Sequence, residues 1–465
     1  MVQNCPHNKK FVIGKPKEEN KEDKQKPRAQ GWVFAMTHRD AQATYDVVIV
    51  LHTDCVVCCD DRIVSILLTN MKDRFSFFIL CMVTLSSFSN TTNASSPLYD
   101  VMNFGAVGDG KTDDSQAFLK AWNEACNVQQ QRATLNVPAR TFLLNPIEFS
   151  GPCVPTSIEF QVAGKIIAST NKSLFDNNHW ILFSYVKGLT LTGSGTIDGQ
   201  GAGSWQDRTG VAALKFYTCP NLVLQGLTHI NPQKAHIILT KCDGANINSI
   251  TITAPEDSPN TDGIDIASSN HVQVQNSKIG TGDDCIAISA RCSFINITGV
   301  TCGPGHGISI GSLGDPGSGD FDTVSEVHVR SCNFTGTNTT GIRIKTWQGG
   351  QGEVKKITYE DIMFDNVRNP IVIDQFYCPH NVCKNNTGTS AVAISDVSYT
   401  GIIGTSSGDE VMSLNCGTES SCNNIVLDDV HLKTSDPTKT AFVRCVNFNG
   451  RASNVEPSLD QCLNS

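Results

Sequence analysis

Residues 262–310 read DGIDIASSNHVQVQNSKIGTGDDCIAISARCSFINITGVTCGPGHGISI, and the spacing within this stretch decides the fold. Three segments, Asp262–Ile266, Asp284–Ile288 and His306–Ile310, begin 22 residues apart and share the pattern Ile-x-Ile. Such alternation is typical of a β-strand with one buried face. A second apolar strand pattern fills each interval, so no room remains for a crossover helix. The stretch therefore excludes a TIM barrel or a dinucleotide-binding fold.

The same patterns extend along the chain from about residue 189. Thr340–Ile344 and Asn369–Ile373 continue the Ile-x-Ile series, and copies are separated by roughly 22 to 35 residues. A β-sandwich would give no reason for this fixed register. We therefore predict an all-β fold, a single-stranded right-handed parallel β-helix with like strands about 4.8 Å apart. Asp114–Cys126 has a helical pattern and is predicted to cap the N-terminal end.

Composition agrees with an elongated repeat protein. Of the 465 residues 39% are hydrophobic, but only 7% are aromatic and 17% charged, a mixture that suits short strands and many turns. The net charge of -9 argues against a nucleic-acid binder. A polyanionic ligand would need a local basic patch.

Cysteine usage indicates an oxidising compartment. Five of the 19 cysteines precede residue 95, and the other 14 form an even set. Close pairs without the spacing of a zinc site favour disulfides. These pairs are Cys378 with Cys383, Cys416 with Cys422 and Cys445 with Cys462. Seven N-x-S/T sequons also agree with a secretory route.

The N-terminal region predicts three segments. Residues 71–94 have a short charged start, an apolar run and small polar residues, which is typical of a secretory signal peptide. We interpret residues 1–70 as a non-functional or wrongly assigned extension, with translation beginning at Met71. The alternative is a genuine disordered or cytosolic head before a signal anchor. Residues 95–465 are then one β-helix domain, secreted and without a membrane span in the mature protein.

The predicted register gathers charged side chains on one outer face. Asp262, Asp284 and His306 occupy the same position on three successive coils, and Asp283 precedes Asp284. Further along, Arg343 takes the outward position of Ile-x-Ile and Lys345 follows two residues later.

Such a column suits glycoside hydrolysis, in which one carboxyl group donates a proton and another activates water. Neighbouring carboxylates raise at least one pKa and so supply the acid. Arg343 and Lys345 would bind a substrate carboxylate, so an anionic sugar is predicted. The column could instead hold Ca²⁺, as in a lyase with an Arg base. His236 is expected to line the groove or to lie on the surface.

Four segments resemble the signatures of polygalacturonases, glycoside hydrolase family 28, in their plant form. They are NTDGID at 260–265, GTGDDC at 280–285, CGPGHGISIGSLG at 302–314 and RIKTWQGG at 343–350. The resemblance begins at YDVMNFGAVGDGKTDDSQAF and reaches the cysteine-rich end. Together the four motifs are highly specific.

The resemblance implies hydrolysis of α-1,4-galacturonosyl bonds in pectin by an inverting mechanism, with no metal or other cofactor. It implies that Asp283 is the general acid, that Asp262 and Asp284 activate water, and that His306 maintains the protonation of the acid. It also implies that Arg343 and Lys345 bind the substrate carboxylate, that Tyr377 lies at a sugar subsite, and that Cys285 pairs with Cys302.

Several alternatives stay open at this point. Asp315-Pro316-Gly317 and Ala287 depart from the commoner family sequence, which leaves the neighbouring subsite undefined. Endo and exo action are both possible, as are a rhamnogalacturonan or xylogalacturonan hydrolase, a Ca²⁺-dependent lyase and an inactive pectin-binding β-helix. We expect a monomer that acts in the plant cell wall on pectin, with an acidic pH optimum.

Overall fold

The computed structural model describes residues 50–52, 54–59, 62–66, 96–175, 179–336, 340–378, 391–418 and 422–463. The chain divides into two compact units, Met1–Ala94 and Ser95–Ser465. The first contains an antiparallel sheet of β1 (Val50–His52), β2 (Asp54–Cys59) and β3 (Arg62–Ile66). The predicted signal peptide, residues 71–94, lies outside the described residues. Its assignment, and that of residues 1–70, stays a prediction.

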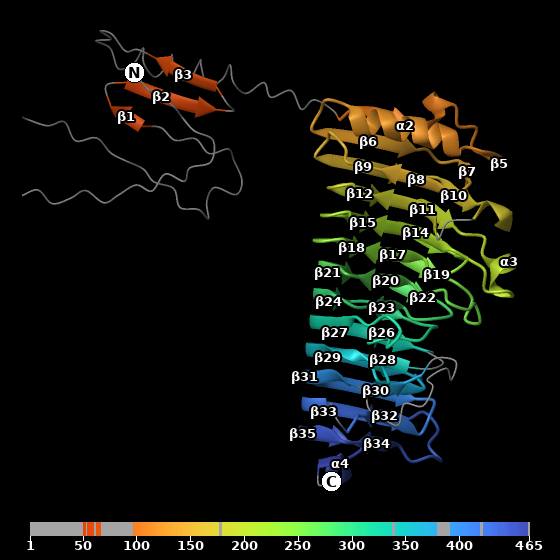
Figure 1. The fold of residues 1–465 in the computed structure, drawn as a ribbon, viewed down its shortest axis with the longest axis vertical. Coiled ribbons are helices and arrows are strands. Elements are labelled where there is room, and N and C mark those ends of the chain that lie inside the picture. Colours follow the sequence, from red (N-terminus) through yellow and green to blue (C-terminus); the bar gives the residue numbers. More distant parts are fainter. Residues whose placement is uncertain are drawn as a thin grey trace, which may run out of the picture. The chain divides into compact units, whose positions relative to one another are not determined.

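The second unit is a parallel β-helix, as predicted, whose strands stack in successive coils along one axis (Figure 1). Two parallel sheets form its walls, one of 21 strands and one of 11. The 11-stranded sheet, called the site sheet below, consists of β8 (Ile147–Ser150), β11 (His179–Ser184), β14 (Ala212–Tyr217), β17 (Ile237–Thr240), β20 (Ile264–Ala267), β23 (Ile286–Ile288), β26 (Ile308–Leu313), β28 (Thr340–Trp347), β30 (Asn369–Tyr377), β32 (Glu410–Asn415) and β34 (Phe442–Val446).

The larger sheet supplies the remaining strands of each coil. It consists of β4 (Leu98–Asp100), β5 (Asp109–Asp113), β6 (Arg132–Val137), β7 (Thr141–Leu144), β9 (Ser157–Val162), β10 (Lys165–Ala168), β12 (Leu189–Thr192), β13 (Thr196–Asp198), β15 (Val223–Gln225), β16 (Thr228–Ile230), β18 (Asn246–Asn248), β19 (Thr251–Thr253), β21 (Asn270–Gln275), β22 (Lys278–Gly280), β24 (Cys292–Thr298), β25 (Thr301–Cys302), β27 (Phe321–Thr335), β29 (Gln351–Asp365), β31 (Ala391–Ser406), β33 (Cys422–Thr434) and β35 (Phe448–Glu456).

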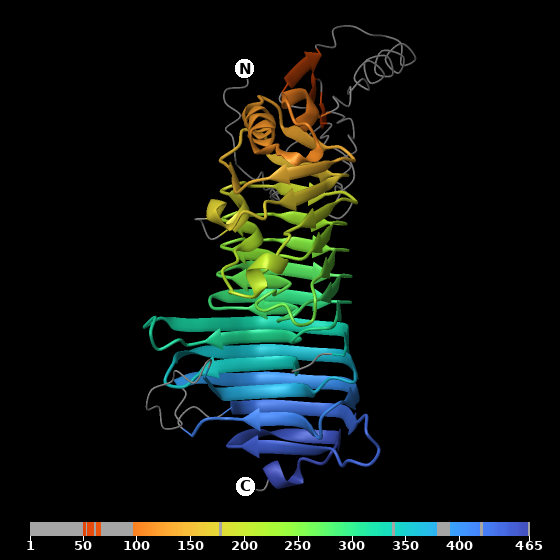
Figure 2. The ribbon, with the colours of Figure 1, turned by 90° about the vertical axis from the view of Figure 1, so that its right-hand side faces the viewer.

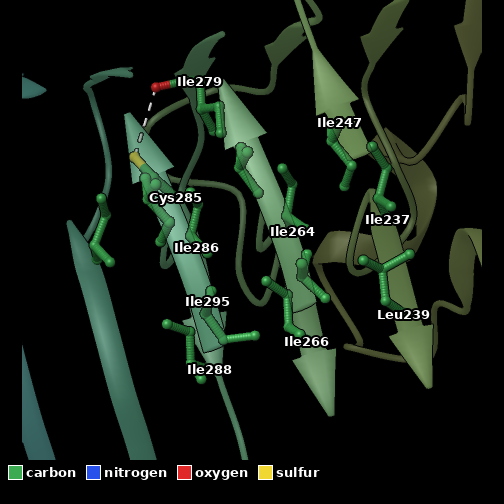
Figure 3. Packing of buried hydrophobic residues seen from close by; sticks show 14 of the residues in the cluster. Ile237, Leu239, Ile247, Ile264, Ile266, Ile279, Cys285, Ile286, Ile288 and Ile295 are labelled. Atoms are coloured by element: carbon green, nitrogen blue, oxygen red, sulfur yellow. Dashed lines mark hydrogen bonds between the residues drawn. The ribbon is translucent and has the colours of Figure 1, made fainter. Parts of the chain in front are cut away.

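The Ile-x-Ile series forms the inner columns of the site sheet. Ile264 pairs with Ile286, and Ile286 with Ile308, so the predicted register is confirmed. Figure 3 shows the paired isoleucines of β20 and β23 pointing into a common interior beside Ile237 and Leu239 of β17. Because side chains of paired strands stack on one another, the core consists of apolar columns that run through successive coils.

The core changes character along the axis. In the N-terminal coils Phe149 stacks on Phe183 and Phe183 on Phe216, with ring centroids 4.9 and 5.5 Å apart. This column continues as Leu239 and Ile266. In the C-terminal coils the strands of the larger sheet lengthen, with 15 residues in β27 and 16 in β31, as Figure 2 shows in teal and blue.

Single residues in the left-handed conformation turn the chain at the end of site-sheet strands. Lys241, Ser268 and Arg291, which follow the site-sheet strands β17, β20 and β23, have φ values of 56°, 50° and 60°. The next strand begins five residues after Lys241, two after Ser268 and one after Arg291. Coils without long loops are therefore short, which explains the 22-residue spacing read from the sequence.

Helix α2 (Ser115–Asn127) closes the N-terminal end, one residue from the predicted limits. Its buried face contains Phe118 and Trp122, and the Trp122 ring lies 5.3 Å from that of Phe149. The other helices are short: η2 (Val101–Phe104), η3 (Lys172–Leu174), α3 (Ala202–Trp205) and α4 (Asp460–Leu463). Among the described residues, none of the helices has the length and apolar character needed to cross a membrane.

Candidate active site

The predicted charged column lies at the entry of three neighbouring site-sheet strands. Asp262, Asp284 and His306 each stand two residues before the first isoleucine of β20, β23 and β26, and these isoleucines are in register. Backbone hydrogen bonds carry the alignment into the corner, since Gly263 N–H donates to Asp284 C=O and Cys285 N–H to Gly307 C=O, at 2.9 and 2.8 Å. The structure therefore brings the three side chains onto adjacent coils.

Asp284 is the most enclosed carboxylate of the column, with 2% of its side chain exposed. Its Oδ1 accepts hydrogen bonds from Ser309 Oγ at 2.8 Å and from Arg343 Nη2 at 3.0 Å. Its Oδ2 accepts from Lys345 Nζ at 3.0 Å. A buried charge needs such compensation, because two cations and a hydroxyl replace the water it has lost.

Asp283 faces His306 rather than the two cations. Its Oδ1 lies 2.9 Å from His306 Nδ1 and also accepts the Asp284 backbone N–H at 2.9 Å. Asn260 Nδ2 donates to its Oδ2 at 3.4 Å. Burial alone would raise the pKa of Asp283, but the hydrogen bond and charge of His306 lower it below its usual value.

The pKa of Asp262 moves in the opposite direction. Burial raises it well above the usual value, and the neighbouring charges of Asp265, Asp283 and Asp284 raise it further. Without substrate, Asp262 is therefore the carboxyl group of the column that holds a proton most readily. The pKa of Asp262 is raised and that of Asp283 is lowered. Such a difference between neighbouring carboxyl groups is what acid and base roles at one site require.

Asp265 is a member of the cluster that the sequence interpretation missed. It takes the outward position of β20, where its column runs through Ala287 and Ser309 to Arg343. Burial and the charge of Asp284 raise its pKa to about 7, and its Oδ1 is buried without a hydrogen-bond partner. The available signal was its place as the x of Ile-x-Ile, the same place that identified Arg343.

Tyr377 lies beside Lys345, as a sugar subsite next to the cations would require. Lys345 Nζ is 5.5 Å from the centroid of the Tyr377 ring, and Trp347 packs edge-on against that ring at 6.1 Å. These three residues come from neighbouring strands, β28 and β30. An aromatic face beside an ammonium group can hold a sugar ring and its carboxylate together.

Close backbone packing holds the acidic residues in place. Gly307 has a φ of 83°, and a Cβ there would lie 1.9 Å from Gly341 O, so only glycine can follow His306. Thr340 Oγ1 donates to His306 C=O at 2.6 Å, and Thr281 Oγ1 to Asp283 C=O at 2.9 Å. Thr340 on the next strand therefore holds the corner at His306, and Thr281, two residues earlier in the chain, holds the corner at Asp283.

One ligand atom from each of Asp283, Asp284 and His306 lies within 4.8 Å of the others, so the cluster has the dimensions of a possible metal site. Both oxygens of Asp284 already accept hydrogen bonds from cationic side chains. A metal ion bound to either oxygen would have to compete with the cationic side chain already there, Arg343 on Oδ1 or Lys345 on Oδ2. The chemistry of the donor set therefore favours an internally neutralised carboxylate over a metal ligand.

A disulfide joins the site to the next coil. The pairing of Cys285 with Cys302, implied by the family resemblance, is confirmed. The predicted pairs Cys416–Cys422 and Cys445–Cys462 are also confirmed, and Cys126–Cys153 is a further bond. Cys378 is disulfide-bonded, but Cys383 lies outside the described residues. Within the part of the chain that the structure describes, four buried cysteines form no disulfide, so the even count did not mean that all are paired: Cys219, Cys242, Cys292 and Cys332.

The prediction for His236 was wrong. Its residue is 1% exposed, so it neither lines the groove nor lies on the surface. His236 stands one residue before β17, in register with Gly263 and Cys285, where the corner turns side chains toward the interior. Burial lowers its pKa well below the usual value for histidine.

The family model of glycosyl hydrolases family 28 matches residues 126–454, which include every residue of the charged column. The chain belongs to this family. Two curated relatives are similar over most of their length. A probable polygalacturonase of Arabidopsis thaliana is 44% identical over 398 residues, covering 84% of this chain and 85% of that protein. A polygalacturonase of Malus domestica is 39% identical over 389 residues, covering 81% and 80%.

Solved family structures share the fold at low sequence identity. An exopolygalacturonase from Thermotoga maritima superimposes with a TM-score of 0.65 at 20% identity, covering 77% of this chain and 91% of that one. An endo-xylogalacturonan hydrolase from Aspergillus tubingensis gives 0.66 at 23% identity, covering 77% and 100%. At this identity the likeness concerns the β-helix alone. Family 28 membership makes the protein a glycoside hydrolase, and its disulfides are those of a secretory-pathway protein.

Proposed function

We propose that this family 28 protein hydrolyses α-1,4-galacturonosyl bonds of polygalacturonate with inversion and without a metal ion. The observation that carries the proposal is the pairing of Asp284 with Arg343 and Lys345, next to the Asp283–His306 pair. Two cations pair with the Asp284 carboxylate, while His306 pairs with the Asp283 carboxyl group, which can pass on a proton. Plant relatives named polygalacturonases support this substrate, as the sequence motifs do.

Binding of a galacturonate carboxylate is assigned to Arg343 and Lys345. Arg343 uses Nε on Ser309 and Nη2 on Asp284, which leaves other N–H donors of its guanidinium group for substrate. Lys345 has three N–H donors and gives one to Asp284. Tyr377 lies beside the Lys345 ammonium and would contact the sugar ring. Both cations can therefore neutralise Asp284 and hold an anionic sugar at the same time.

The general acid is assigned to Asp283, acting with His306. The lowered pKa of Asp283 means that the free carboxyl group alone would be ionised, which at first opposes this role. The two side chains are joined at 2.9 Å, however, so a proton on this bond belongs to the pair and can move to Asp283 as the leaving oxygen takes up charge. In this role His306 supplies the proton that Asp283 passes on, in addition to orienting the Asp283 carboxyl group.

Water activation is assigned to Asp284 and Asp262 together. Asp284 is paired with two cationic side chains, and Asp262, with its raised pKa, is the stronger proton acceptor once ionised. An inverting enzyme needs roughly 6.5 to 9.5 Å between acid and base to admit the water. One oxygen of Asp283 and one of Asp284 lie within 4.8 Å of each other in the free protein, so the inversion proposed here requires the two carboxyl groups to move apart when substrate and water bind. We expect the rate to peak at acidic pH, because the Asp283–His306 pair must keep its proton. A rate maximum above neutral pH would contradict these roles.

We also propose which pectin is the substrate and where the protein acts. Arg343 and Lys345 favour unsubstituted galacturonate over the branched or rhamnose-containing pectins, and endo or exo action is left undefined. Disulfides suit action outside the cell, in the plant cell wall.

The test uses the full chain secreted from a eukaryotic host, with polygalacturonate in the presence of EDTA. New reducing ends and absorbance from unsaturated products are followed together, and the anomer formed first is identified by NMR. We expect reducing ends, no unsaturation and a β-anomer, all abolished by Asp283→Asn. Unsaturated products that need Ca²⁺ would indicate elimination, and binding without any cleavage would indicate an inactive pectin-binding protein.

A further inference from the structure

A second group of cationic and aromatic residues lies on the site sheet, toward the N-terminal end. Lys215 and Tyr217 take the two outward positions of β14, with the buried Phe216 between them. Arg343 and Lys345 take the same two positions of β28, with the buried Ile344 between them. The strand pairings that connect the first positions run from Lys215 through Ile238, Asp265, Ala287 and Ser309 to Arg343.

These five pairings place the two groups about 24 Å apart along one strip, at about 4.8 Å for each step. Measured from Asp284, which precedes β23, strand β14 is three steps away, or about 14 Å. The positions between them on the Tyr217 side are the small residues Thr240 and Ala267. On the Tyr217 side the two strands therefore carry no bulky side chain, whereas Ile238 stands between Lys215 and Asp265 on the other side.

Lys241 completes the N-terminal group. Its Nζ donates to Tyr217 Oη at 3.1 Å and lies 5.2 Å from the centroid of the Tyr217 ring. The Tyr185 ring, 54% exposed, packs edge-on against Tyr217 at 5.5 Å. This arrangement resembles the pair of Lys345 and Tyr377 in the candidate active site, where the corresponding distance is 5.5 Å. The strip thus carries the same ammonium-over-tyrosine arrangement twice.

An anionic sugar chain is the ligand that this chemistry fits. The protein has a net charge of -9, so cations gathered beside an exposed aromatic pair indicate an anion rather than general surface polarity. The nearest acidic groups in the Lys215 column are Glu148 and Asp265, each two strands away. Glu148 Oε1 already accepts hydrogen bonds from Ser150 and Ser184, and burial together with the charge of Asp284 raises the pKa of Asp265 to about 7. Lys215 and Lys241 therefore keep donors for a carboxylate from outside.

We propose that Lys215, Tyr217 and Lys241 form a distal subsite that binds a galacturonate residue of the same polysaccharide chain that is cut beside Asp283. The proposal rests on the polygalacturonase function proposed above. One sugar advances a polysaccharide by about one coil spacing, so the distal subsite is reached only by chains that extend about three residues past the cut. Long substrates would use it and short ones would not.

The test compares Lys241→Glu and Tyr217→Ala with the unmodified full chain on polygalacturonate and on trigalacturonate. Lys241 is an exposed corner residue, so charge reversal there does not threaten the fold. We expect KM for the polymer to rise about fivefold or more with kcat little changed, and kinetics on the trimer to stay the same. The Lys241→Glu effect should shrink as salt is raised. Lys120→Glu on α2 is the matched control and should behave like the unmodified protein.

Either of two results would overturn the subsite. The first is an unchanged KM for the polymer in both variants, and the second is an equal loss on polymer and trimer, which would indicate a structural or catalytic defect. Failure of the proposed function is a separate outcome, since the unmodified protein itself would then leave polygalacturonate uncut. In that case binding of the polymer to Asp283→Asn, with and without Lys241→Glu, decides the subsite independently, and equal binding would reject it.

Discussion

Asp284 on the outer face and His229 in β16 are both buried titratable residues, but their hydrogen-bond partners differ. Asp284 is buried, and both of its oxygens accept hydrogen bonds from cationic side chains. His229 is 1% exposed, and neither of its ring nitrogens has a hydrogen-bond partner. His229 lies in an inner column between Ile197 and Ile252, whereas Asp284 lies where long side chains from two coils away can reach it.

The difference shows how a solenoid can place polar groups. An outward position can have polar neighbours on nearby coils, so its partners can come from residues far along the chain, as Lys345 does for Asp284. An inner column is aliphatic on both sides, and a polar residue placed there keeps only the neutral form. Burial accordingly lowers the pKa of His229 to about 3.

Neutralising Asp284 should have the largest effect. Asp284→Asn keeps the shape of the side chain but removes the charge that activates water and balances two cations. We expect kcat on polygalacturonate to fall about a thousandfold, within the range known for loss of a general base. The exposed pair of His271 and Asp243 offers a matched control, Asp243→Asn, which should leave kcat unchanged. Retention of a tenth or more of the activity by Asp284→Asn would remove Asp284 from the mechanism.

Removing one cation should weaken the same site by an intermediate amount. Lys345→Met keeps an apolar stem but leaves Asp284 Oδ2 without its partner. Breaking a buried ion pair from one side costs about 3 kcal/mol of unfolding free energy. Asp284 would then keep Arg343 as its cationic partner, so kcat on polygalacturonate should fall by a smaller factor than in Asp284→Asn.

The control for this change is an ion pair at the surface. Lys165 lies 2.8 Å from Asp198, and 43% of its side chain is exposed. Lys165→Met should cost less than about 1 kcal/mol by urea unfolding, because water screens such pairs. Equal losses in the two variants would show that burial does not distinguish them, and an unchanged kcat in Lys345→Met would separate that lysine from Asp284.

The sequence was sufficient to predict which residues share a column, but not where side chains point at the corners between strands. Ile-x-Ile with a fixed spacing predicts the register, and register alone brings Asp262, Asp284 and His306 together. It says nothing about where a side chain points at a corner, so His236 was misplaced. Pairings such as Asp284 with Lys345 join residues 61 apart and depend on side-chain reach, which a pattern does not give. Asp265 occupies the outward x position of its strand, where the pattern alone does not distinguish a site residue from a surface residue.

A pH-dependent effect on stability should follow from His229. Its pKa is about 3 in the folded protein and near 6.5 in the unfolded chain, so between these values only the unfolded state binds the proton. Folding stability is therefore lost as pH falls below about 6.5, by up to about 1.4 kcal/mol for each pH unit. His229→Ile, which continues the column of Ile197 and Ile252, should remove this loss.

The measurement is urea unfolding of both proteins at pH 7.5 and pH 4.5. We expect His229→Ile to be more stable than the unmodified protein by roughly 2 kcal/mol more at pH 4.5 than at pH 7.5. His271 is an exposed histidine beside Asp243, and His271→Gln should not change the pH dependence by this amount. Stability curves of the unmodified protein and His229→Ile that fall in parallel with acid would contradict a neutral buried His229.

The smallest change in unfolding free energy is expected for a new buried hydroxyl group that has a hydrogen-bond acceptor within reach. Ser269 and Cys292 follow the corner residues Ser268 and Arg291, and Ser269 Oγ donates to Ala267 C=O at 2.9 Å. Cys292 Sγ lies 3.8 Å from the equivalent carbonyl, that of Ala290. A hydroxyl in Cys292→Ser should therefore be satisfied as the one in Ser269 is, and the unfolding free energy should change by about 1 kcal/mol or less. A loss of several kcal/mol would mean that partner availability does not decide the cost of a buried polar group in this solenoid, against the comparison of Asp284 with His229.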